Sequence, residues 1–325
     1  MPRESTPTAR ADRSLRPEIE QFLIKMAEAG ENLPPLTDVP FPEARRLTEE
    51  ARKPFYEGGP DMCSIEDKIL PLSCGNVRIR IYSPSTETTT PALFYIHGGG
   101  WVLFSLDTHD RLMREYAART GFRVIGIDYS HAPEKKYPGQ LIEVAETILW
   151  CQQHADELDI DRERLTLGGD SAGGNLTIAA CLKLREMGHL DLIKALVLNY
   201  GAFDGRRCHA SYKKFGSGEY LLSGEEMDWF WGCYLESEEQ VLDPMASPIL
   251  ANVTGLPPVY MVISDFDVLY DENMEMKKNL EQAGVAVTAK VCTGTTHSFL
   301  ESMMFGGIAE EALDETGAWL LNTLN

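Results

Sequence analysis

The chain has 325 residues, and 43% of them are hydrophobic, which is enough for a large core and argues against a disordered protein. Acidic residues outnumber basic residues by 50 to 30, so the formal net charge is −20 at pH 7. A field of that sign repels phosphate backbones and anionic lipid surfaces. We therefore expect no nucleic-acid partner and no membrane partner.

The cysteines indicate the redox compartment. There are seven, they are scattered, and no two form a Cys-x-x-Cys pair. This spacing is not typical of a disulfide framework or a zinc knuckle, and it fits a reducing compartment. The first 21 residues include no apolar signal segment, and no run of about 18 apolar residues is present that would span a bilayer. We expect a cytoplasmic protein.

Residues 1–60 are polar with helical patches. Ile19, Phe22 and Met26 would share one helical face, and four prolines between residues 34 and 42 then break the pattern. This segment has no strand pattern. It is typical of an arm or a cap.

From residue 77 the pattern changes to strands that alternate with helices. Residues 77–82 alternate apolar and polar side chains, which predicts a half-buried strand. Further apolar runs predict buried strands, and their alternation with helices predicts a mostly parallel central sheet flanked by helices on both faces. We predict these strands over residues 92–96, 123–128, 165–167, 195–198, 259–263 and 285–291, and helices over residues 111–119, 141–154, 175–186, 271–283 and 308–321.

One insertion, at about residues 205–250, interrupts this alternation. It has no clear strand pattern, and it contains Trp229, Phe230 and Trp231 in a row on a predicted short helix. Three adjacent aromatic side chains are compatible with core packing or with a lid over an apolar pocket. We favour the lid because the insertion falls on the side of a doubly wound sheet where ligands bind.

A glycine-rich corner follows the strand at residues 165–167. Residues 169–173, GDSAG, fit the pattern Gly-x-Ser-x-Gly and stand between this strand and an apolar helix. In a nucleophile elbow this arrangement exposes the serine hydroxyl above the sheet, which makes Ser171 a candidate nucleophile. The alternative is a glycine-rich turn whose serine caps the helix.

A serine nucleophile needs a base, and the base needs an orienting acid. In the elbow fold they follow in the order Ser, Asp or Glu, His. His297 is the only one of the seven histidines that follows the last predicted strand, so we assign it as the base. The acid should lie just beyond the strand at residues 259–263, where spacing alone does not separate Asp265 from Asp267.

Acyl transfer also needs backbone N–H groups that stabilise a negative oxygen. Gly98, Gly99 and Gly100 follow a predicted buried strand, and bare glycines allow a backbone to approach a ligand closely. The N–H of Ala172, the residue after the candidate nucleophile, would be a further donor. The alternative for the glycines is a flexible turn. A phosphate-binding loop would require the P-loop or dinucleotide pattern, which this sequence does not contain.

Together these motifs resemble one known family. Residues 97–101 (HGGGW) and 168–175 (GGDSAGGN) resemble the hormone-sensitive-lipase-like branch of the α/β-hydrolases, and so do residues 128–134 (DYSHAPE) and 267–272 (DVLYDE). The context of the glycine triplet, LFYIHGGG with the later LDTHDR, is similar to the bacterial acetyl esterases of that branch.

The resemblance implies an α/β-hydrolase fold with a helical cap, built from residues 1–60 and about 205–250 on a catalytic domain of residues 61–325. It selects Asp267 as the acid, since this residue opens the DVLYDE stretch, although Val268 stands where the family usually has proline. It also implies that the oxyanion donors are Ala172 and the glycine triplet, Gly98, Gly99 and Gly100, with Gly99 and Gly100 favoured over Gly98.

We therefore expect a carboxylic ester hydrolase in which Ser171 is the nucleophile, His297 the base and Asp267 its orienting acid. We expect no cofactor and no metal ion, and the expected partner is a small ester. The resemblance further implies short acyl chains. The alternatives are an amidase or peptidase on the same fold, or a catalytically silent receptor, which would be expected to lack a member of the triad. The sequence does not define an oligomeric state.

Overall fold

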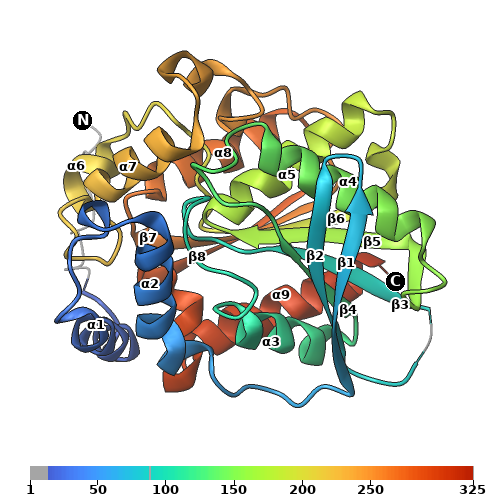
Figure 1. The fold of residues 1–325 in the computed structure, drawn as a ribbon, viewed down its shortest axis with the longest axis horizontal. Helices are drawn as coiled ribbons and strands as arrows, with labels where there is room; N and C mark the ends of the chain where they lie inside the picture. Colours follow the sequence, from blue (N-terminus) through green and yellow to red (C-terminus); the bar gives the residue numbers. More distant parts are fainter. Residues whose placement is uncertain (1–13, 88, 325) are drawn as a thin grey trace, which may run out of the picture.

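The computed structural model describes residues 14–87 and 89–324. These residues form an eight-stranded sheet with helices on both faces (Figure 1), in the strand order β1-β2-β4-β3-β5-β6-β7-β8. The pairs β1–β2 and β2–β4 are antiparallel, and every later neighbour is parallel. The predicted mostly parallel sheet flanked by helices is therefore confirmed.

The predicted strands and helices are all present, with ends that shift by a few residues. The structure adds an edge strand, β1, which the sequence analysis did not predict. The strands are β1 (Ser64–Leu72), β2 (Gly75–Ser83), β3 (Thr90–Ile96), β4 (Arg123–Asp128), β5 (Ile160–Asp170), β6 (Ile193–Asn199), β7 (Val259–Phe266) and β8 (Val287–Thr296). The helices are α1 (Pro17–Gly30), α2 (Phe41–Tyr56), α3 (Asp110–Thr120), α4 (Gly139–Gln153), α5 (Ala172–Glu186), α6 (Ala210–Phe215), α7 (Gly224–Tyr234), α8 (Tyr270–Gln282) and α9 (Ile308–Leu324). In the described part of the chain, no helix has the length and apolarity needed to cross a membrane.

The core lies on both faces of the sheet because successive strand residues point to opposite sides. In β3, Phe94 and Ile96 join the apolar cluster beneath α4, α5 and α8, whereas Leu93 and Tyr95 join the cluster beneath α3 and α9. Figure 1 shows these two groups of helices on opposite faces. Burial on both faces explains why the central strands read as continuous apolar runs.

Two segments that are distant in sequence meet at the left of Figure 1, where α1 and α2 lie near α6 and α7. Phe22 of α1 packs edge-on against Phe55 of α2, with ring centroids 5.3 Å apart. Phe41 of α2 stacks on Trp229 of α7 at 5.8 Å. These are the two segments predicted to build a cap, although residues 1–13 of the first lie outside the described residues.

The cysteines differ in their exposure to solvent. Cys63 and Cys208 are exposed, whereas Cys151 and Cys292 are buried. Burial raises the pKa of both Cys151 and Cys292 to about 12, so almost none of either thiol is ionised at pH 8. We expect a disulfide reagent to modify Cys63 and Cys208 in the native protein, and Cys151 and Cys292 only after unfolding. Peptide mapping by mass spectrometry checks this, and native modification of Cys292 as fast as that of Cys208 would contradict the packing of β8.

Candidate active site

Ser171 stands at the corner between β5 and α5, in a backbone conformation that few side chains adopt. Its φ is 54° and its ψ is −118°. The corner is tight because Gly173 packs directly against the end of β3. A Cβ added at Gly173 would lie 1.8 Å from the carbonyl oxygen of Ile96. The Ser171 hydroxyl makes no cap hydrogen bond to α5, so the alternative of a helix-capping serine does not describe this residue.

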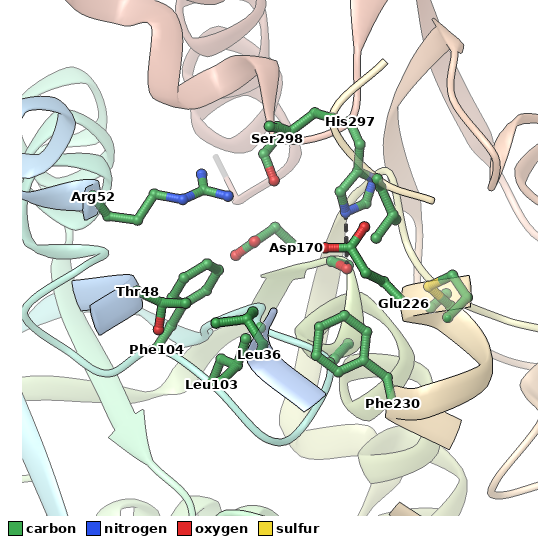
Figure 2. Close-up of a pocket in the computed structure, with 18 of the residues that line it drawn as sticks. Leu36, Thr48, Arg52, Leu103, Phe104, Asp170, Glu226, Phe230, His297 and Ser298 are labelled. Atoms are coloured by element: carbon green, nitrogen blue, oxygen red, sulfur yellow. Dashed lines mark hydrogen bonds between the residues drawn. The ribbon is translucent and has the colours of Figure 1, made fainter. Parts of the chain in front are cut away.

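Three side chains predicted to act together lie in hydrogen-bond contact. The Nε2 atom of His297 is 3.0 Å from the Ser171 hydroxyl oxygen, and its Nδ1 atom is 2.8 Å from Oδ2 of Asp267 (Figure 2 labels His297). Each of the three residues is buried, at 8% exposure or less. They come from the carboxyl end of β5, the loop after β7 and the loop after β8, which lie on the same edge of a parallel sheet.

The two candidate acids have different partners. Asp265 accepts backbone hydrogen bonds from Gly294 at 2.7 Å and Thr295 at 3.3 Å, so it holds the end of β8. Asp267 contacts His297, and its other oxygen accepts the N–H of Leu269 at 2.9 Å. Val268 stands where the family usually has proline, and the hydrogen bond from Leu269 to Asp267 still forms across this turn.

The glycine loop after β3 presents free backbone donors. Gly99, Gly100 and Trp101 all have positive φ angles, of 107°, 59° and 62°. The N–H of Gly98 donates to Oδ1 of Asp170 at 3.2 Å, whereas the N–H groups of Gly99, Gly100 and Ala172 donate to no acceptor in the described part of the chain. Gly98 is therefore occupied within the protein, and the other three N–H groups remain available.

Asp170, the residue before the serine, joins this loop to the elbow. Its carboxylate accepts hydrogen bonds from Tyr95 at 3.0 Å and from His109 at 3.2 Å, as well as from Gly98. Burial acts to raise the pKa of Asp170, but His109 and Tyr95 outweigh it and hold this pKa below its ordinary value. Burial likewise acts to lower the pKa of His109, and the carboxylate outweighs it and raises that pKa. The two side chains form a buried hydrogen-bonded pair directly behind the loop.

A mainly apolar pocket of about 210 Å³ opens over the serine. In Figure 2 its wall brings together Thr48 and Arg52 from α2, Phe230 from α7 and Ser298 from the loop after β8. Of the three adjacent aromatic residues in the insertion, Phe230 lines the pocket, Trp231 is buried against Trp101, and Trp229 stacks on α2. The lid and the core-packing interpretations therefore each describe part of this helix.

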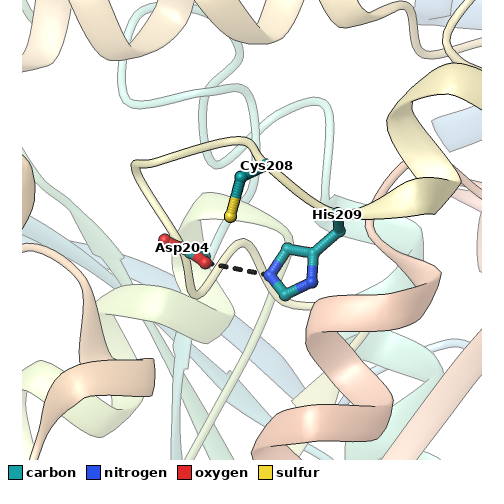
Figure 3. Close-up of side chains that lie close together, drawn as sticks. All are labelled: Asp204, Cys208 and His209. Carbon is teal, nitrogen blue, oxygen red and sulfur yellow. Dashed lines mark hydrogen bonds and ion pairs between the residues drawn. The ribbon is translucent and has the colours of Figure 1, made fainter.

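One group of side chains brings three potential metal ligands close together. Among the described residues, the ligand atoms of Asp204, Cys208 and His209 lie within 4.8 Å of one another (Figure 3). Both Asp204 oxygens already accept hydrogen bonds from Arg206 at 2.8 Å, and Oδ2 accepts a further one from His209 at 2.9 Å. We interpret the group as an ion-pair cluster that fixes the loop before α6. The expected absence of a metal ion stays a prediction.

Several residues around the site could not be assigned a role from the sequence. Asp170 lies inside the Gly-x-Ser-x-Gly motif, but the motif leaves this position open. Arg52 faces the pocket and pairs with Glu301 at 2.5 Å, a contact across 249 residues that no local pattern signals. Glu272 is wholly buried and accepts the N–H of Phe203 at 2.8 Å. Burial, with Asp204 and Asp267 nearby, raises its pKa well above the ordinary value.

The sheet order, the serine at a strand-to-helix corner and the partners at later strand ends define the α/β-hydrolase class. A family model described as the alpha/beta hydrolase fold matches residues 93–301. The chain belongs to this family, and its resemblance to the hormone-sensitive-lipase-like branch is confirmed by the esterases to which it is similar.

The chain is 34% identical over 307 residues to the ethyl acetate hydrolase of Pseudomonas putida, which covers 92% of this chain and 95% of that protein. It is 33% identical over 276 residues to an acetyl esterase of Salmonella paratyphi B, with 84% of each chain covered. Among solved structures, a hyperthermophilic esterase from the archaeon Pyrobaculum calidifontis superimposes with a TM-score of 0.90 at 29% identity, covering 95% of this chain and 98% of that one.

Proposed function

We propose that this protein is a carboxylic ester hydrolase that works through a covalent acyl-enzyme. The observation that carries this proposal is the hydrogen-bonded series Ser171–His297–Asp267, with Ser171 to His297 at 3.0 Å and His297 to Asp267 at 2.8 Å. The names of the relatives, ethyl acetate hydrolase and acetyl esterase, support an ester as the substrate. An amidase on this fold would use the same side chains, and those names favour the ester.

In the first half-reaction the Ser171 oxygen attacks the ester carbonyl carbon while Nε2 of His297 takes the hydroxyl proton. Collapse of the tetrahedral intermediate expels the alcohol, to which His297 returns the proton. Water then attacks the acyl-enzyme with His297 again as base, and the acid leaves. Asp267 fixes the tautomer with the proton on Nδ1 and stabilises the imidazolium that forms in each half-reaction.

The oxyanion donors in this proposal are the N–H groups of Gly99, Gly100 and Ala172. None of these three N–H groups donates to a protein acceptor in the described residues, whereas Gly98 donates to Asp170. Donors that are fixed in advance stabilise the charged intermediate more than the neutral ester, which lowers the barrier. A helix begins at Ala172, so its positive end adds to this field.

The cap in this proposal is made of residues 1–60 and about 205–250, on the catalytic domain of residues 61–325. The pocket lining supports it, because Met26, Leu36 and Arg52 from the first segment and Met227 and Phe230 from the second face the same pocket as Ser171. A pocket of about 210 Å³ favours short acyl chains. The cytoplasmic location stays a prediction.

Replacing Ser171 with alanine removes the nucleophile and leaves the corner backbone free to form. We expect kcat/KM for p-nitrophenyl acetate to fall by at least about 10³-fold, the usual loss for a triad residue. Ser264→Ala is the matched control, because Ser264 is also buried and its hydroxyl has no hydrogen-bond partner in the described residues. A phosphonate that labels serine should modify the wild type and the control, but not Ser171→Ala. Retention of a tenth of the wild-type rate would remove Ser171 from this role.

The two neighbouring aspartates allow a test of the acid. In Asp267→Asn the amide favours the wrong His297 tautomer, so we expect kcat to fall by about 10³- to 10⁴-fold. Asp265→Asn instead weakens the two backbone contacts at the end of β8, so it should lower the thermal midpoint and leave kcat far less affected. Steady-state kinetics and thermal unfolding of both variants check this prediction. A reversed order of the two kcat values would mean that the acid is misassigned.

Acyl-chain length tests the size of the pocket. We expect kcat/KM for p-nitrophenyl esters to be highest from acetate to butyrate and to fall from octanoate onward, because a long acyl chain and the nitrophenyl group together overfill a pocket of about 210 Å³. A series of esters with the same leaving group isolates the acyl side. A rate that rises steadily to decanoate would contradict the short-chain preference while leaving ester hydrolysis intact.

A further inference from the structure

Arg45 of α2 connects the N-terminal helices to the glycine loop. Its Nε atom donates to the carbonyl oxygen of Val102 at 2.8 Å, and Nη2 donates to the carbonyl oxygen of Ala132 at 2.9 Å. The same guanidinium forms two parallel hydrogen bonds with Glu134, at 2.9 and 2.6 Å. Four hydrogen bonds to two loops that lie 57 to 89 residues away make Arg45 a long-range clamp.

The two carbonyl contacts belong to one connected piece of backbone. Val102 donates its N–H to the carbonyl oxygen of Gly99 at 3.1 Å, and Ala132 donates its N–H to the carbonyl oxygen of Trp101 at 2.8 Å. Arg45 therefore closes a ring of contacts around residues 99–102. This ring contains Gly99 and Gly100, whose N–H groups are the proposed oxyanion donors.

The loop needs such support because its conformation is unfavourable on its own. Gly99, Gly100 and Trp101 have positive φ angles in succession, and Phe104 follows with a φ of 71°. Trp101 and Phe104 carry side chains that disfavour this region, so the surrounding contacts must hold them there. A guanidinium suits this role, because its planar donors reach two carbonyls and a carboxylate at once, whereas an ammonium group cannot.

The neighbouring residue, Arg46, provides an internal comparison. Within residues 14–87 and 89–324, its guanidinium pairs only with Glu43 and Glu50 of the same helix, and its side chain is 52% exposed. The Arg45 side chain is 18% exposed, while its partner Glu134 is 55% exposed. An ion pair with such an exposed carboxylate contributes little, so the carbonyl contacts are the part of the clamp that orders the loop.

We propose that Arg45 is a positioning residue for the oxyanion site: it fixes the directions of the Gly99 and Gly100 N–H groups through the carbonyls of Val102 and Ala132. The inference rests on the proposed ester hydrolysis, because that reaction is what requires these N–H groups to stabilise an oxyanion. The cap helices α1 and α2 would then have two roles: they line the pocket, and they hold the glycine loop in position.

The test compares Arg45→Met with Arg46→Met. A misplaced donor weakens binding of the charged intermediate more than that of the neutral ester. We therefore expect Arg45→Met to lower kcat for p-nitrophenyl acetate by about 10- to 100-fold with KM changed less than about threefold. Inhibition by a trifluoromethyl ketone, which forms an oxyanion on the serine, should weaken by a similar factor. Arg46→Met should leave kcat, KM and inhibition within about twofold of the wild type, since it removes only exposed pairs.

Two further variants separate positioning from stability. Glu134→Gln removes the ion pair but leaves the two carbonyl contacts, so kcat should stay within about threefold of the wild type. Arg45→Lys keeps the charge and can reach one carbonyl, so kcat should lie between those of the wild type and Arg45→Met. Thermal unfolding of each variant shows whether the fold is intact, and if Arg45→Met does not fold, Arg45→Lys and Glu134→Gln carry the comparison.

The outcomes separate this inference from the proposed function. An equal loss of kcat in Glu134→Gln and Arg45→Lys, or an Arg45→Met enzyme with wild-type inhibition by the ketone, would overturn the positioning role and leave ester hydrolysis in place. A wild-type protein without esterase activity would instead overturn the proposed function itself.

Discussion

The close contact between the start of α5 and the end of β3 is the constraint on which the site depends. At Gly173 an added Cβ would lie 1.8 Å from the carbonyl oxygen of Ile96 and 2.8 Å from that of His97. Ser171 stands two residues before Gly173, and the glycine loop begins directly after His97. One contact therefore sets the distance between the nucleophile and the backbone donors. Asp170 reinforces it by accepting the N–H of Gly98 from the elbow side.

The N-terminal segment stabilises the other side of the site. Arg16 donates to the carbonyl oxygen of Thr293 at 3.0 Å, near the end of β8, the strand that leads to His297. Arg45 holds the glycine loop, and Arg52 pairs with Glu301 in the 3-10 helix Phe299–Phe305 that follows His297. Arginine presents several donors in a fixed plane, so each of these side chains can hold a segment of the catalytic domain in place. The helices that cover the pocket are thereby coupled to the geometry of the catalytic loops.

The sequence predicts those features that are encoded locally. Runs of apolar residues marked the central strands because both faces of the sheet are buried, and the edge strand β1 was missed because most of its residues are partly or fully exposed. The motifs around Ser171 and Gly98 are local too, because a tight corner and a close backbone approach both require glycine. Asp265 and Asp267 could not be separated by spacing, since the difference between them is their partner: one reaches the backbone of β8 and the other reaches His297.

What the sequence could not predict are roles that depend on a distant partner. Arg45 and Arg46 are the same residue type in adjacent positions of one polar helix, so no property of the local sequence distinguishes them. A rotation of about 100° along an α-helix turns the first toward the glycine loop and the second toward solvent. The energetic difference follows from that rotation, because a guanidinium that satisfies buried carbonyls is costly to remove, whereas exposed pairs contribute little. A residue that positions a catalytic loop is therefore recognised by the backbone atoms it reaches, and those are visible only once the chain has folded.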